Sequence, residues 1–169
     1  DGYEGNYNEE HWHTAKDLYG MSKSVGEPEN ATVIRTSIIG EEIGQARSLV
    51  EWIKSNKGKT VNGYINHLWN GITCLQFAKV CEDIIEENLF WKGVKHITSP
   101  SSVSKYNLVR LVSGVYDLDV TVTPHEATVA CDRTLTSTRT DVMFKDIPDL
   151  KDQVIEMKKF YSKLKKEKI

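Results

Sequence analysis

The sequence predicts an α/β fold whose sheet is incomplete. Short β-branched runs, such as residues 31–40 and 93–99, alternate with longer amphipathic segments, a pattern typical of layered α/β proteins. Only three or four of the runs are convincing strands, whereas a doubly wound sheet normally has more. The 169 residues are enough for one domain, since domains contain roughly 100–200 residues.

Local patterns in the first half of the chain predict a loop, two helices and two strands. Gly20 and Gly26 each weaken the first helix by about 1 kcal/mol relative to Ala, so other contacts must hold it. Asn62-Gly63 predicts a turn in the second strand. The segments are a loop over 1–10, a helix over 17–27, a buried strand over 31–40, a helix over 45–58 and a short strand over 59–64.

The second half predicts three more helices and two more strands. Residues 75–90 form the clearest amphipathic helix, with apolar and charged side chains on opposite faces. Serines begin the next helix, and Pro148 lies in the first turn of the last. The segments are helices over 75–90, 101–116 and 147–169, and strands over 93–99 and 119–124, the latter ending at Pro124.

Composition excludes several broad classes of function. A net charge of −2 argues against a general nucleic-acid-binding protein. No apolar run approaches the roughly 20 residues of a membrane span, and residues 1–10 contain no apolar core of a signal peptide. Three cysteines without a CxxC pair fit a reducing compartment. We therefore expect a cytoplasmic protein with neither a nucleic-acid nor a membrane partner.

Tyr19 and Lys23 are the strongest candidates for chemistry. They stand four residues apart in Y-G-M-S-K, which places them on one face of a helix. An ammonium beside a phenol stabilises the phenolate, so the tyrosine becomes usable as a general acid or base. The same spacing also arises by chance in many helices.

The surrounding residues resemble the extended short-chain dehydrogenase/reductases, and among them the dTDP-4-dehydrorhamnose reductases. That family reads V-F-D-G, then Y-x-E, then L-Y-G-x-S-K-x-x-G-E, then a strand close to L-R-T-S. The matching positions here are Asp1-Gly2, Tyr7-Asn8-Glu9, Tyr19 to Lys23, Gly26-Glu27 and Arg35-Thr36-Ser37. The resemblance implies a Rossmann-type sheet and a small α/β substrate-binding domain.

The resemblance also implies a role for particular residues. Tyr19 would protonate the ketone oxygen of a nucleotide-linked sugar, and Lys23 would support it and hold the nicotinamide ribose of NADP or NAD. Arg35, Thr36 and Ser37 would lie beside that cofactor, at the end of a strand. The implied substrate-binding residues are Trp69, Asn70 and Arg133, the last as a partner of the diphosphate.

Each of the weaker candidates has a structural alternative. Arg35 could pair with a carboxylate near the strand end, Trp69 could belong to the core, and Arg133 could be a solvated surface charge. His11 and His13 have no third ligand at a convincing spacing, so a loop that leads into a helix explains them better than a metal site.

The chain departs from the family in two ways, and both concern its N-terminal side. It contains no G-x-G-x-x-G or G-x-x-G-x-x-G turn for a pyrophosphate, and the family's Ser/Thr partner of the tyrosine would precede Asp1. We therefore expect the C-terminal part of a longer reductase, with residues 1–40 ending the nucleotide-binding domain and residues 41–169 mainly binding substrate. Alone, the chain should be inactive and should self-associate.

Two other functions remain open at this stage. Epimerases and dehydratases of nucleotide sugars share Tyr-x-x-x-Lys, and some relatives of these reductases are regulatory subunits that bind nucleotide without turnover. The R-T-S strand favours a reductase of nucleotide-linked 4-keto-6-deoxy sugars.

Overall fold

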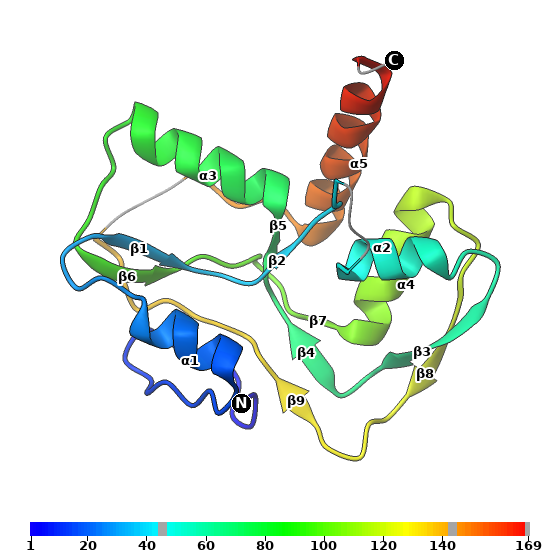
Figure 1. Cartoon of the computed structure of the whole chain (residues 1–169), viewed down its shortest axis with the longest axis horizontal. Coiled ribbons are helices and arrows are strands. Elements are labelled where there is room, and N and C mark those ends of the chain that lie inside the picture. Colours follow the sequence, from blue (N-terminus) through cyan, green and yellow to red (C-terminus); the bar gives the residue numbers. More distant parts are fainter. Residues whose placement is uncertain (44–46, 142–144, 168–169) are drawn as a thin grey trace.

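The computed structural model describes residues 1–43, 47–141 and 145–167 and shows a mixed α/β chain (Figure 1). Its helices are α1 (Leu18–Val25), α2 (Leu49–Ser55), α3 (Cys74–Glu86), α4 (Lys105–Tyr116) and α5 (Leu150–Glu167). Its strands are β1 (Thr32–Arg35), β2 (Ile38–Ile39), β3 (Thr60–Tyr64), β4 (His67–Trp69), β5 (Ile72–Thr73), β6 (Gly93–His96), β7 (Val103–Ser104), β8 (Thr121–His125) and β9 (Cys131–Asp132). The predicted α/β class is confirmed.

Parallel pairing dominates the short sheets. β1 pairs with β6, β2 with β5, and β3 with β8, all in parallel. β4 lies between antiparallel β7 and parallel β9. In the β1–β6 pair, Arg35 is the register partner of His96, so these two residues share the carboxyl end of the pair.

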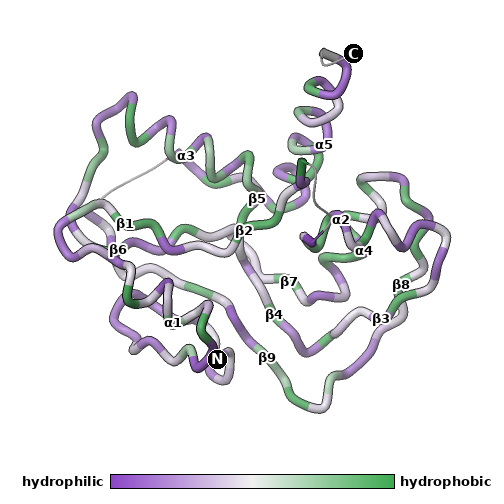
Figure 2. The backbone as a smooth tube through the Cα atoms, viewed as in Figure 1, coloured by the Kyte–Doolittle hydropathy of each residue, from purple (hydrophilic) through white to green (hydrophobic). Residues whose placement is uncertain are grey.

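Two hydrophobic cores hold the described elements together. One lies between α3 and the β1–β6 pair, where Val80 and Ile84 of α3 pack near Trp91 and Ile97. The larger core joins α2, α4 and α5 through buried side chains such as Val50, Leu108 and Val154. Figure 2 shows the corresponding alternation of hydrophobic and hydrophilic turns along α3 and α5.

Local capping explains where several helices begin. Asp17, Ser48, Thr73 and Ser104 each accept a hydrogen bond from a backbone N–H in the first turn of the helix that follows. Such caps satisfy donors that the helix itself leaves free. Among the described residues, no helix is both long and apolar enough to cross a membrane.

Several details predicted from the sequence are wrong. The predicted strand over 31–40 is divided into β1 and β2. Residues 103–104 of the predicted helix over 101–116 form β7, and Pro148 precedes α5, which begins at Leu150.

The strand β3 continues through Asn62-Gly63 instead of turning there, and Gly63 is needed because a Cβ at this position would lie 2.7 Å from the Cα of Tyr106 in α4. The strand β8 continues past Pro124 to His125. Pro124 is tolerated because β8 pairs only with β3 among the described strands, so its other edge needs no N–H donor.

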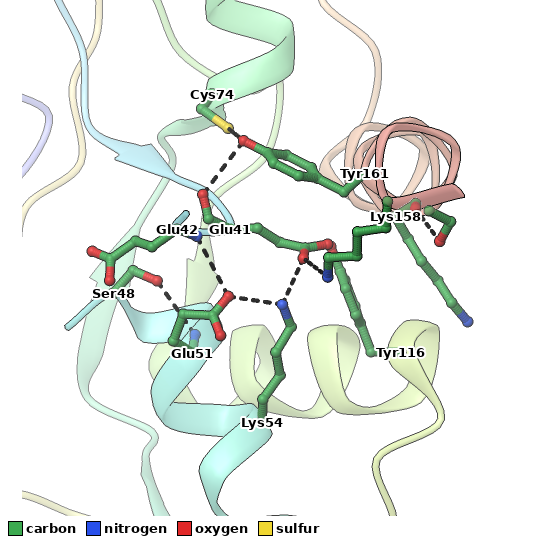
Figure 3. Close-up of polar contacts among 11 residues, drawn as sticks. Glu41, Glu42, Ser48, Glu51, Lys54, Cys74, Tyr116, Lys158 and Tyr161 are labelled. Atoms are coloured by element: carbon green, nitrogen blue, oxygen red, sulfur yellow. Dashed lines mark hydrogen bonds and ion pairs between the residues drawn. The ribbon is translucent and has the colours of Figure 1, made fainter. Parts of the chain in front are cut away.

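A buried carboxylate fastens the segment after β2 to three helices (Figure 3). The side chain of Glu41 is 4% exposed and accepts from Lys54 of α2 at 2.7 Å, Tyr116 of α4 at 2.8 Å and Lys165 of α5 at 2.9 Å. Burial alone would raise the pKa of Glu41, but these donors hold it below its usual value. The same burial and the hydrogen bond to Glu41 raise the pKa of Tyr116.

Candidate active site

The predicted pair Tyr19 and Lys23 lies together on the solvent-exposed helix α1. Asp17 caps this helix by accepting from the N–H of Gly20 at 2.8 Å. The ammonium of Lys23 lies 5.5 Å from the centre of the Tyr19 ring, close enough for a cation–π contact. Tyr19 is 74% exposed, so its phenol is open to a substrate.

A hollow of about 320 Å³ lies beside α1. Its lining brings together Lys23 from α1, Arg35 from β1, His96 from β6 and Arg133 from the segment after β9. Because Arg35 and His96 end parallel strands, the hollow lies where α/β proteins commonly bind ligands. Tyr19 is not among its lining residues, although the next residue of α1, Gly20, is.

Arg35 uses its guanidinium to hold a carboxylate. Its Nε and one terminal nitrogen donate to the two oxygens of Glu27, both at 2.6 Å. In this structure Arg35 therefore pairs with a carboxylate, as the structural alternative predicted. That hydrogen bond, opposed by partial burial, holds the pKa of Glu27 below its ordinary value.

Thr36 and Ser37 turn the chain from β1 toward β2. The Thr36 hydroxyl donates to the Ser37 carbonyl at 3.5 Å, and the Ser37 hydroxyl accepts from the Trp69 indole at 2.7 Å. The Ser37 carbonyl also accepts from the N–H of Ile72 at 2.9 Å. These residues fix the β1–β2 turn to the β4–β5 segment.

Trp69 and Asn70 lie inside the protein. Trp69 is 4% exposed and belongs to the larger core. The Asn70 amide clamps Leu135, donating to its carbonyl at 2.7 Å and accepting from its N–H at 2.9 Å. Since Leu135 lines the hollow, Asn70 shapes the hollow through that backbone clamp.

Arg133 is exposed at the hollow, and its neighbour Lys105 was not among the residues predicted from the sequence. Neither forms an ion pair within the residues that the structure describes. Lys105 lies over the Trp69 ring at 5.6 Å, and burial, followed by the charge of Arg133, lowers its pKa. One signal was available: Lys105 begins α4, and a cation at a helix N-terminus is unfavourable.

His96 and Glu9 are also part of the site, although His96 stands alone in the sequence. The Nδ1 of His96 lies 3.0 Å from the Tyr7 carbonyl and 2.9 Å from the Thr136 carbonyl, so it carries the proton. Its buried Nε2 has no hydrogen-bond partner among the residues that the structure describes, and burial lowers the pKa of the imidazole. Glu9 accepts from the His96 N–H at 2.8 Å.

Histidines near α1 hold the loop that precedes it. His11 accepts from the Asn8 N–H at 3.0 Å, and His13 contacts the Ser24 hydroxyl. Within residues 1–43, 47–141 and 145–167, no group of three His, Cys, Asp or Glu side chains is arranged to hold a metal ion.

Comparison of sequences finds neither a matching family model nor a matching curated protein. Comparison of structures finds close likenesses. The dTDP-4-dehydrorhamnose reductase of Bacillus anthracis str. Ames, in complex with NADP, matches at a TM-score of 0.68 and 16% identity, over 94% of this chain and 59% of that one. The orthologue from Clostridium acetobutylicum ATCC 824 matches at a TM-score of 0.69 and 16% identity, over 96% of this chain and 62% of that one.

Enzymes of other reactions match as well. The dTDP-glucose 4,6-dehydratase of B. anthracis str. Ames, in complex with NAD, matches at a TM-score of 0.62 and 13% identity, over 96% of this chain and 57% of that one. The chain thus spans about 60% of the length of these enzymes. Its mixed α/β fold, with parallel strands, matches the Rossmann-like fold of these solved structures.

Proposed function

We propose that this chain is the C-terminal portion of an NAD(P)-dependent reductase of nucleotide-linked 4-keto-6-deoxy sugars. The observation that carries the proposal is the Lys23 ammonium 5.5 Å from the centre of the Tyr19 ring, on an exposed helix beside a hollow. The likeness to dTDP-4-dehydrorhamnose reductases supports the same reaction class.

Tyr19 is the proton donor in this proposal. The phenol transfers its proton to the ketone oxygen of the sugar, which becomes the hydroxyl of the product. The Lys23 ammonium, 5.5 Å from the centre of the Tyr19 ring, offsets the negative charge that the transfer leaves on the tyrosine. A positioned acid of this kind contributes about 10²–10⁴-fold to a rate.

The described residues fit one end of a nicotinamide dinucleotide. Lys23 lines the hollow and has ammonium donors for ribose hydroxyls, and His96 lines the same hollow. When bound, the cofactor supplies the hydride. The chain has no Gly-rich turn for the pyrophosphate, so we assign only the nicotinamide ribose to these residues.

Arg133 and Lys105 are the groups that we assign to the substrate diphosphate. Their two positive charges have no ion-pair partner among the described side chains, and guanidinium pairs with phosphate in a fork. Trp69 and Asn70 act indirectly in this proposal: Trp69 supports Lys105 and Ser37, and Asn70 fixes Leu135.

The assay uses the full-length product of the gene that encodes this chain. Oxidation of NADPH is followed with dTDP- and UDP-linked 4-keto-6-deoxy sugars, and the sugar product is identified by NMR. The proposal predicts stoichiometric cofactor oxidation and a 4-hydroxy sugar. An epimerised or dehydrated sugar without net oxidation of NADPH would contradict the proposal and show that the protein is an epimerase or a dehydratase. Nucleotide binding without turnover, together with co-purification of a second enzyme, would favour a regulatory subunit.

A further inference from the structure

The helix that carries Tyr19 and Lys23 has no apolar anchor within the described chain. None of its eight residues is buried, and its aliphatic residues Leu18, Met21 and Val25 are 86%, 49% and 86% exposed. Most protein helices are held by packing of an apolar face. The position of α1 must therefore depend on a small number of polar contacts.

The strongest of these contacts lies at the C-terminal end of α1. Gly26 ends the helix, and Glu27 follows it directly. Both oxygens of Glu27 accept from Arg35 at 2.6 Å, and Arg35 is the last residue of β1. The two side chains are each 23% exposed, so water screens this pair less than a surface ion pair.

His13 joins the same pair from the loop before α1. Its Nε2 contacts the Arg35 guanidinium and lies 3.6 Å from Glu27, while its Nδ1 contacts the Ser24 hydroxyl of α1. The loop before α1 and the C-terminal end of α1 are thereby both tied to the carboxyl end of β1. His13, Glu27 and Arg35 all line the hollow that Lys23 lines.

We infer that Glu27 and Arg35 form a positioning pair that holds α1, the helix of Tyr19 and Lys23, against the end of β1, so that Lys23 lines the hollow. A pair joined by two hydrogen bonds fixes the relative orientation of the two side chains as well as their distance, because each of two guanidinium nitrogens donates to a different carboxylate oxygen. A lysine at position 35 would keep the charge and lose the paired hydrogen bonds. The pair acts through α1 and is not itself a catalytic group; only its effect on turnover rests on the proposed function.

The test measures how fast trypsin cleaves the bond after Lys23, with the products identified by mass spectrometry. The variants are Glu27→Gln, Arg35→Lys and the exchanged pair Glu27→Arg with Arg35→Glu. The control is Asp141→Asn, which breaks another two-bond arginine–carboxylate pair, Arg139 with Asp141, away from α1. Thermal unfolding of each variant separates release of α1 from global unfolding.

We expect cleavage after Lys23 to be about tenfold faster in Glu27→Gln and in Arg35→Lys, because a charged hydrogen bond is lost. The control should keep the wild-type cleavage rate, and the exchanged pair should restore most of the resistance. Wild-type resistance in both single variants, or equal sensitivity in the control, would overturn the inference.

A second measurement separates this inference from the proposed function. If the full-length protein reduces a nucleotide-linked sugar, Arg35→Lys should lower kcat about tenfold and leave the KM of the sugar nearly unchanged, with recovery in the exchanged pair. An unchanged kcat beside faster cleavage would contradict the positioning role. A wild-type protein without reductase activity would overturn the proposed function and leave the cleavage result standing.

Discussion

Glu41 and Glu9 are acidic side chains whose partners come from distant parts of the chain. Glu41 binds α2, α4 and α5. Glu9 accepts from Ser137 at 2.5 Å and from the Thr138 N–H at 3.0 Å, as well as from His96. Burial opposes ionisation of Glu9, yet these donors lower its pKa to about 2. Both carboxylates therefore stabilise the fold only while they are ionised.

The depressed pKa values predict acid sensitivity. A carboxylate whose folded pKa lies below its unfolded value, about 4.3 for Glu, contributes stability that is complete above that value. The contribution is lost as the pH falls from about 5 toward 2. Glu41→Gln should lower the free energy of unfolding by about 1–3 kcal/mol at pH 7 and flatten its decline below pH 5.

Urea unfolding of wild type and Glu41→Gln between pH 3 and pH 7 measures this effect. Glu82→Gln is the control, because Glu82 lies on α3 and has no ion pair among the described side chains. A variant that lost as much stability at pH 3 as at pH 7 would show that ionisation of Glu41 contributes nothing.

At the residue scale, the sequence identified Tyr19 and Lys23 as candidates but not the residues that hold their helix in place. Tyr19 and Lys23 are neighbours through helical spacing alone, a local property. The sequence left two partners open for Arg35, the cofactor and a carboxylate. Which one it contacts depends on where α1 ends relative to β1, and that is a property of the tertiary structure. His96 was missed because only the parallel pairing of β1 with β6 brings it beside Arg35.

At the scale of elements, α5 depends on a buried amide as well as on its apolar stripe. The apolar spacing of the last helix predicts a buried stripe; Leu150, Val154 and Met157 are buried, whereas Phe160 of the same predicted stripe is 44% exposed. Gln153, between them, is 1% exposed, accepts from the Thr73 N–H at 3.0 Å and donates to Ser99 at 3.0 Å. The sequence pattern gave no sign of this contact, because helical periodicity marks apolar positions and not buried polar ones.

Gln153→Ala should destabilise the protein by about 1–3 kcal/mol, because the N–H of Thr73 would be buried without a partner. Lys151→Ala, at an exposed position in the same helical turn, is the control and should change stability by less than about 0.5 kcal/mol. Equal midpoints of thermal unfolding for the two variants would contradict the role of this amide.

Long periodic segments were predicted well, and short strands were not. The helices α2 to α5 carry enough apolar residues at helical spacing to be identified locally. The strands β4, β5, β7 and β9 have two or three residues each, too few for alternation to be read. Asn62-Gly63 imitates a hairpin turn, but Gly63 is there because α4 approaches the strand closely.

At the scale of the whole molecule, the described chain leaves apolar and hydrogen-bonding surface uncovered. Leu18 and Val25 of α1 and nearby Trp12 are each at least 86% exposed. Among the described strands β1 pairs only with β6, so its other edge is open, and open edges favour association. The division of the chain at residue 40 remains a prediction from the sequence.

We predict that the isolated 169-residue chain self-associates through this surface. Sedimentation velocity should show a concentration-dependent increase in mass, reduced by Leu18→Glu with Val25→Glu. Ile85→Glu places the same charge on an exposed residue of α3 and should leave association unchanged. A monomer at every concentration, or equal loss in the control, would contradict the prediction.

The turnover rate of Tyr19→Phe in the full-length protein, at saturating NADPH and sugar nucleotide, tests the central claim most directly. Removing the phenol hydroxyl should lower kcat by about 10²–10⁴-fold while both ligands still bind. Tyr106→Phe, on α4, should keep the wild-type rate. A Tyr19→Phe protein that reduces the sugar at the wild-type rate would show that this tyrosine is not the proton donor.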